Sequence, residues 1–129
     1  MAQRLVSPRL EDIVEAISRI QHILHGVTLE RFEQDWEKRW LVERGVEIIS
    51  EASRHLDDDL KLRRREIPWS KVAGIGNILR HAYDHVAADV LWKLAQADLP
   101  PLHEVCRDEL AAALARENHD SGTRAKPKT

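Results

Sequence analysis

The chain has 129 residues, 43% of them hydrophobic, which fits one domain with one core rather than two. Lysine and arginine number 20 against 22 aspartate and glutamate residues, so the formal net charge is -2. This balance excludes a globally positive field that would draw in nucleic acid, and any RNA binding must therefore use a local patch. The single cysteine, Cys106, excludes an internal disulfide and is expected to be buried in a protein of a reducing compartment.

The chain carries no signal for a membrane. No stretch approaches the roughly 18 consecutive apolar residues that cross a bilayer. The amino-terminal segment reaches Arg9, Glu11 and Asp12 where a secretory peptide would need an apolar core. We therefore expect a soluble, cytoplasmic protein that does not associate with membranes.

Helical signals begin near the amino terminus. Ser7 and Pro8 suit the start of a helix, and the apolar residues that follow at helical spacing predict a helix over residues 8–25. Gly26 is expected to end this helix, and Thr28 can cap the next one.

A second helical segment leads into a longer one. Phe32 and Trp36 belong to the second segment, and apolar residues between 41 and 56 predict the long helix, with the break between the two left open. Residues 57–68 lack apolar periodicity and end in Pro68, so we expect them to form a connection without a helix.

The second half of the chain predicts three more helices. Apolar residues at helical spacing indicate one from Trp69 to about Leu79 and one from about Val86 to Asp98. Pro100-Pro101 is expected to interrupt the chain before a last helix, and residues 118–129 are too polar to order themselves. We predict an all-α bundle of four main helices plus short helices, with a domain over residues 1–117 and a disordered tail over 118–129.

Several short blocks in the second half occur in a fixed order. They are Ile67-Pro68-Trp69, Asn77, His81, Tyr83, Leu91-Trp92 and Asp98-Leu99-Pro100. The set resembles the HepT-like family of the HEPN superfamily. The corresponding sequence motifs of that family are I-P-W, R-N-x-x-x-H-x-Y, V-W and D-L-P. Residues 10–13 and 43–52 are similar to the first and the long helix of that family, so the resemblance covers about residues 8 to 112. Matching blocks at these separations are far more specific than an isolated R-x-x-x-x-H.

The resemblance implies a homodimeric HEPN bundle that acts as the toxin of a toxin-antitoxin pair. Such a protein is a metal-independent endoribonuclease without a cofactor, which cleaves tRNA or mRNA at a cleft between two copies. His81 would move protons during attack by the ribose 2′-hydroxyl. Asn77 would contact phosphate or hold the loop, with a helix cap or turn as its structural alternative. A cognate MntA-like nucleotidyltransferase antitoxin would add AMP to Tyr83 and block the site by bulk and charge.

The chain departs from the family motif at one position. Gly76 stands where the family has the arginine that steadies phosphate charge. Arg80 lies four residues later on the same helical face, so its guanidinium can reach back over Gly76. Arg44 of the long helix is a second candidate for this role. A third interpretation is a catalytically weakened HEPN protein that serves as dimeric partner or substrate-binding subunit of a nucleotidyltransferase.

Two charged groups outside the motif need separate interpretations. Arg63, Arg64 and Arg65 form a candidate patch for RNA phosphates, with a solvated surface turn as the alternative. His22 and His25 are three residues apart but lack a fixed third ligand, so we predict no metal site.

Overall fold

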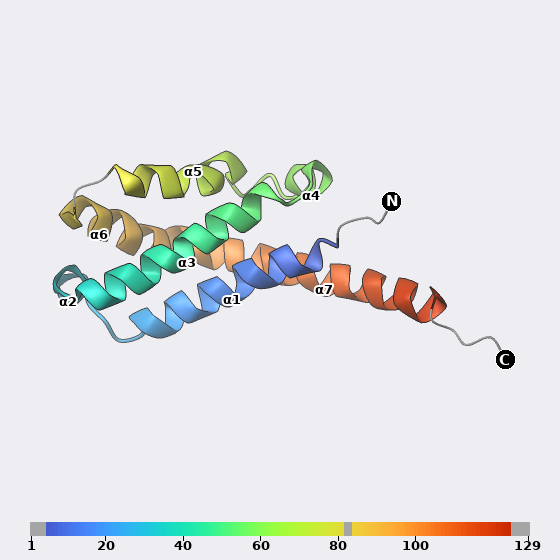
Figure 1. Ribbon diagram of the computed structural model, residues 1–129, viewed down its shortest axis with the longest axis horizontal. Coiled ribbons are helices and arrows are strands. Elements are labelled where there is room, and N and C mark those ends of the chain that lie inside the picture. Colours follow the sequence, from blue (N-terminus) through green and yellow to red (C-terminus); the bar gives the residue numbers. More distant parts are fainter. Residues whose placement is uncertain (1–4, 82–83, 125–129) are drawn as a thin grey trace.

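The computed structural model describes residues 5–81 and 84–124, and within these residues it contains helices and connections but no strand (Figure 1). The predicted all-α class is therefore confirmed for the described part of the chain. None of the helices described is long and apolar enough to span a bilayer. In chain order the elements are α1 (Ser7–Leu24), α2 (Leu29–Gln34), α3 (Trp36–Arg54), α4 (Asp58–Arg63), α5 (Trp69–Arg80), α6 (Asp84–Lys93), the π-helical turn η1 (Leu94–Asp98) and α7 (Leu99–Arg124).

The first two helix boundaries follow the turn signals of the sequence. Gly26 has a φ of 74°, a left-handed conformation that glycine adopts without strain, and it follows the last turn of α1. The Thr28 hydroxyl accepts a hydrogen bond from the Arg31 backbone N–H at 3.3 Å, as expected of a cap. The Asp35 carboxylate accepts one from the Lys38 N–H at 3.1 Å, so the break lies at Asp35 and Trp36 begins α3.

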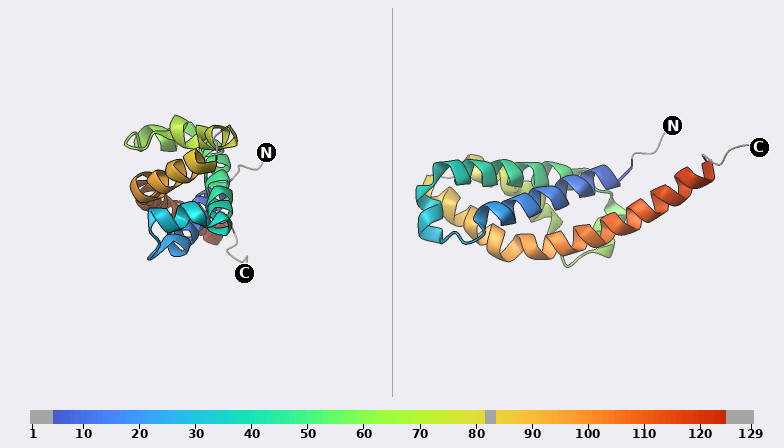
Figure 2. Two further views of the ribbon diagram at one scale, coloured as in Figure 1. Left: turned by 90° about the vertical axis from the view of Figure 1, so that its left-hand side faces the viewer. Right: turned by 90° about the horizontal axis from the view of Figure 1, so that it is seen from below.

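Helix α3 is the central contact element of the bundle. It packs against α1 and against α5, while α7 packs against α1, and both described ends of the chain lie away from the carboxyl end of α5 (Figure 1). Figure 2 shows the same bundle from two further sides. Ile17, Val42 and Val46 are among the side chains buried between these helices. At the α1–α3 crossing, a Cβ added to Gly45 would lie 2.8 Å from Ile20 Cδ1. The close approach of the two helices at this point therefore favours glycine at position 45.

The expectation of a helix-free connection over residues 57–68 is wrong for Asp58–Arg63, which form α4. The Asp57 carboxylate caps this helix by accepting the Leu60 N–H at 2.9 Å. Two aspartates in the first turn and basic residues in the last turn complement the helix dipole. Leu60 is the apolar side chain of this short helix that is buried in the core.

The expected interruption at Pro100-Pro101 is also wrong, because α6, η1 and α7 form one continuous helical run (Figure 2). The Leu99 N–H donates to the Leu94 carbonyl across the wider π turn. Proline rings clash with the carbonyl four residues earlier in an α-helix, and a wider turn relieves this clash. The two prolines then occupy the first turn of α7, where a missing N–H costs least.

Helix α7 continues through Arg124, so residues 118–124 are helical in the structure, while the disordered tail over 118–129 stays a prediction. The stretch before it is rich in alanine, which favours helix more than other residues do. The Ser7 hydroxyl also donates a hydrogen bond to the Glu117 carboxylate, which ties this part of α7 to the first turn of α1.

Glu109 of α7 is a buried carboxylate that holds α4 in place. It is 7% exposed and accepts hydrogen bonds from Arg63 Nη2 at 2.8 Å and Arg64 Nε at 2.9 Å. Burial alone would raise the pKa of Glu109, but the hydrogen bonds from Arg64 and Arg63 outweigh burial and lower it below the ordinary value of 4.5. The carboxylate is therefore charged at neutral pH and stabilises the α4–α7 contact.

We expect Glu109→Gln to lower the free energy of unfolding by about 2 kcal/mol at pH 7, because two charge-assisted hydrogen bonds are weakened. A lowered folded pKa gives stability that is complete above the unfolded pKa and is lost as the pH falls through the folded pKa. Urea denaturation should therefore show the difference between wild type and variant shrinking below about pH 4.5. Glu104→Gln, at an exposed position of the same helix, is the control. Equal stability of Glu109→Gln and wild type at pH 7 would contradict this role.

Candidate functional site

A shared hydrogen-bond acceptor sets the position of α5 on α3. The buried Ser50 hydroxyl of α3 donates to the Ala73 carbonyl at 2.7 Å, and Arg54 Nη2 donates to the same carbonyl at 2.8 Å. Two donors from successive turns of α3 hold one point of α5. Gly76, one turn after Ala73, consequently faces α3.

An open hollow of about 190 Å³ lies between α3 and α5 next to this contact. We call it the arginine hollow, and its lining residues are Arg44, Glu47, Ser50, Glu51, Arg54, Gly76 and Arg80. Three arginines against two glutamates give it a formal charge of +1. The hollow is therefore a local positive site on a chain whose net charge is -2.

Gly76 forms part of the wall of the hollow. A Cβ added there would lie 3.8 Å from Ser50 Oγ and 3.9 Å from Arg80 Nη2. The Arg80 guanidinium thus lies beside the point where a side chain at position 76 would begin. This is the placement expected for residues four apart on a helix, whose side chains lean toward the amino terminus. A catalytic role for Arg80 stays a prediction.

The glutamates of the hollow form exposed ion pairs with their arginine neighbours. Arg44 Nη1 lies 3.9 Å from Glu47 Oε2, and the Arg44 side chain is 72% exposed. Arg54 Nη1 lies 3.3 Å from Glu51 Oε1. A hydrogen bond from His55 is the main cause of the lowered pKa of Glu51, so that carboxylate is engaged on two sides. Exposed pairs of this kind contribute little free energy, so Arg44 can turn toward an incoming anion at low cost.

The predicted motif residues lie at the carboxyl end of α5. His81 directly follows Arg80, and its backbone N–H donates to the Ile78 carbonyl at 3.2 Å to end the helix. The side chains of His81 and Asn77 are exposed, within about one helical turn of the arginine hollow, although neither lines it. Tyr83 lies outside the described residues.

The second basic group of the sequence lies at the other end of α5. Arg63 and Arg64 are hydrogen-bonded to Glu109, and Arg65 is exposed beside them. Helix α5 has 12 residues and is therefore roughly 18 Å long, with α4 near its amino-terminal end and His81 at its carboxyl end (Figure 1). Of the predicted cations, Arg44 and Arg80 therefore lie together, and the 63–65 group lies apart from them.

Four residues that line the hollow were not predicted as site residues from the sequence, namely Glu47, Ser50, Glu51 and Arg54. The signal for Arg54 is its spacing from Arg44, Glu47 and Glu51 at intervals of three, four and three residues. This spacing places all four on one face of α3. Ser50 carries no comparable signal, because its role depends on the carbonyl that α5 brings to it.

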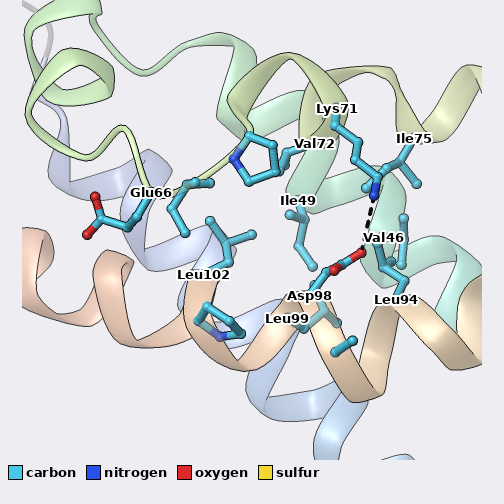
Figure 3. A pocket seen from close by; sticks show the side chains of 14 residues that line it. Val46, Ile49, Glu66, Lys71, Val72, Ile75, Leu94, Asp98, Leu99 and Leu102 are labelled. Carbon is cyan, nitrogen blue, oxygen red and sulfur yellow. Dashed lines mark ion pairs between the residues drawn. The ribbon is translucent and has the colours of Figure 1, made fainter.

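A second hollow lies at the amino-terminal end of α5 and is mainly apolar (Figure 3). It measures about 170 Å³, with Ile67 and Pro68 on the α5 side and Asp98 and Leu99 on the η1–α7 side. Lys71 Nζ lies 3.9 Å from Asp98 Oδ2 across it. Parts of the I-P-W and D-L-P blocks thus meet here and position α5, while the motif histidine lies at the opposite end of that helix.

Comparison with known proteins identifies the family. A family model described as "Ribonuclease HepT-like" matches residues 13–109, which run from α1 into α7 and include both hollows and His81. The chain belongs to the HepT-like ribonuclease family. The resemblance found in the sequence motifs is therefore confirmed.

Relatives within the HepT-like family are named as ribonucleases. The chain is 41% identical over 93 residues to "Probable ribonuclease HepT" of Thermococcus cleftensis, covering 72% of this chain and 84% of the relative. It is 31% identical over 102 residues to "Putative RNase MJ1380" of Methanocaldococcus jannaschii, covering 79% of this chain and 94% of the relative. The search of solved structures found no match.

We expect Gly76→Ala to raise the free energy of unfolding by about 1 kcal/mol, because alanine favours helix over glycine and the added methyl has only ordinary contacts. Chemical denaturation of the two proteins measures this gain. Gly45→Ala is the matched comparison and should gain less, since its Cβ would lie 2.8 Å from Ile20 Cδ1. Destabilisation by Gly76→Ala would mean that α5 lies closer to α3 than described.

Proposed function

We propose that this HepT-like protein is an endoribonuclease toxin that cleaves tRNA or mRNA without a metal ion. The observation that carries the proposal is that Arg80, next to His81 in the chain, has its Nη2 atom 3.9 Å from where a Cβ at position 76 would stand, and that Arg44 lines the same hollow. The arginine that the family motif places at position 76 is absent, and three other arginines, Arg44, Arg54 and Arg80, line the hollow beside Gly76. The relatives named as ribonucleases support the same reaction class.

The proposed chemistry uses one proton-transfer group and one charge-stabilising group. His81 accepts the proton of a ribose 2′-hydroxyl, whose oxygen attacks the adjacent phosphorus and forms a cyclic phosphate. The bond to the 5′-oxygen of the next nucleotide breaks, and that oxygen receives a proton from solvent water, while His81 later returns its proton to solvent. Arg80 and Arg44 stabilise the negative charge that develops on the phosphate oxygens, and Asn77 contacts the phosphate.

The family resemblance supports two partners for this activity. Two copies of the chain would face each other with their motifs in one cleft, which doubles the cations available to one RNA strand. A cognate nucleotidyltransferase antitoxin would add AMP to Tyr83, which follows His81 by two residues. The attached phosphate and nucleotide would exclude RNA phosphate by bulk and by like charge.

Gly76 also favours a second candidate function. Without an arginine at this position the protein would be a weakened nuclease that serves as partner or substrate-binding subunit of the nucleotidyltransferase. Such a protein would retain the fold and the dimer but would leave RNA intact.

We expect purified wild-type protein to cleave RNA in the presence of EDTA and His81→Ala to be inactive. Arg80→Ala should lower the cleavage rate about a hundredfold or more, because one preorganised donor to the transition state is lost. Cleavage of end-labelled RNA under single-turnover conditions measures both effects. Arg107→Ala, an exposed arginine of α7 outside the hollow, is the matched control and should cleave at the wild-type rate.

The variants separate the alternatives. An Arg80→Ala protein with the wild-type rate, together with an inactive Arg44→Ala protein, would assign the arginine role to Arg44. Intact RNA after incubation with wild-type protein would overturn the nuclease proposal and leave the partner function.

We expect co-expression with the cognate nucleotidyltransferase to raise the mass of this chain by one or more AMP units and to relieve growth inhibition. Intact-mass spectrometry detects the change, and Tyr83→Phe should abolish it because phenylalanine lacks the acceptor hydroxyl. A Tyr83→Phe protein that still gains AMP would place the modification on another residue.

A further inference from the structure

The first two turns of α3 expose an aromatic pair. Trp36 is 54% exposed and Trp40 is 66% exposed, and their rings meet edge to face with centroids 5.0 Å apart and an interplanar angle of 74°. Of the other two tryptophans, Trp69 is buried and Trp92 is partly buried and packs against Phe32. Two adjacent large aromatic side chains left in water on one helix indicate a contact surface.

The aromatic pair continues directly into the arginine hollow. Trp36, Trp40 and Arg44 are spaced by four residues, so they lie on one face of α3 at steps of roughly 6 Å. Arg54 lies on the same face farther along, and Arg80 of α5 borders it. We call the row from Trp36 to Arg54 the α3 stripe. It presents aromatic side chains at one end and, at the other, guanidinium groups that alternate with the exposed carboxylates of Glu47 and Glu51.

This arrangement fits an unpaired nucleic-acid strand. Single-stranded RNA brings flat bases that stack on aromatic rings and phosphates that pair with arginine, alternating along its length. A base in a duplex has both faces covered by its neighbours and offers nothing to the tryptophans. RNA brings the charge opposite to that of these arginines. A second copy seated directly on this face would place its own arginines against them, whereas a copy facing it across the proposed cleft would leave the face open to RNA.

We propose that the α3 stripe is a binding track for single-stranded RNA, in which Trp36 and Trp40 stack on bases beside the phosphate held by Arg44 and Arg80. This inference rests on the proposed function and adds its substrate class. The protein would select unpaired segments, such as loops, and the stacked bases would lie one or two nucleotides from the phosphate at the hollow.

The test measures binding separately from cleavage. Every protein tested carries His81→Ala, so that the RNA is not cleaved. Each protein is titrated into a fluorescently labelled oligouridine strand and, separately, into a labelled duplex of equal length. Trp40→Ala should weaken binding of the single strand about fivefold to a hundredfold, the usual effect of losing one stacking ring. Trp40→Phe should retain most of the affinity. Leu62→Ala removes a side chain of α4 that is 59% exposed and serves as the matched control.

Tryptophan emission gives a second readout that a purely structural role would not move. Unlabelled single-stranded RNA should quench the emission of the His81→Ala protein. The quenching should disappear when Trp36→Ala and Trp40→Ala are added, although Trp69 and Trp92 still emit. Affinity of the duplex should be the same with and without Trp40.

Three results would overturn the track. An unchanged affinity of Trp40→Ala for single-stranded RNA would show that the tryptophans do not bind RNA. This result would not contradict the proposed nuclease activity. No binding of any RNA by any variant would remove both the track and the proposed function. A lower particle mass of Trp40→Ala in light scattering, with unchanged RNA affinity per chain, would show that a second copy covers the tryptophans.

Discussion

The carbonyl of Ala73 is the point on which the candidate site depends. A buried hydroxyl and a guanidinium from α3, those of Ser50 and Arg54, both donate to it. Buried polar groups need partners, so sliding α5 along α3 would leave Ser50 unsatisfied. Helix α5 contains two glycines, each of which costs roughly 1 kcal/mol of helix stability, and its position therefore relies on such external contacts. With this register set, Gly76 and Arg80 lie opposite Arg44.

The arginines of this protein serve two physical purposes. Arg63 and Arg64 donate hydrogen bonds to the buried carboxylate of Glu109. Loss of these two hydrogen bonds would leave a buried charge without a partner. Arg44, Arg54 and Arg80 border an open hollow instead, where their pairs with glutamate are exposed and easily exchanged. A chain with a net charge of -2 thereby concentrates positive charge at one place, as its composition required of any nucleic-acid site.

Most helices of the bundle could be predicted because their signals are local. The start of α2 follows from Thr28, and the end of α1 follows from Gly26, which is the residue that most easily adopts a positive φ. The errors have equally specific causes. Helix α4 has a cap at Asp57 but a single buried apolar residue, too few for a periodic pattern. The π turn before Pro100 is a backbone adjustment that cannot be predicted from the residue types in this segment.

The sequence by itself determined the all-α class, the HepT-like family and the position of His81 in its motif. These properties depend on residue order over a few turns and on blocks at set separations. Only the tertiary structure decided which cations lie near Gly76, because Arg44 and Arg54 are more than twenty residues away along the chain. Their place beside Arg80 follows from how α5 packs on α3, and that packing depends on a carbonyl and a hydroxyl that meet only in the folded protein.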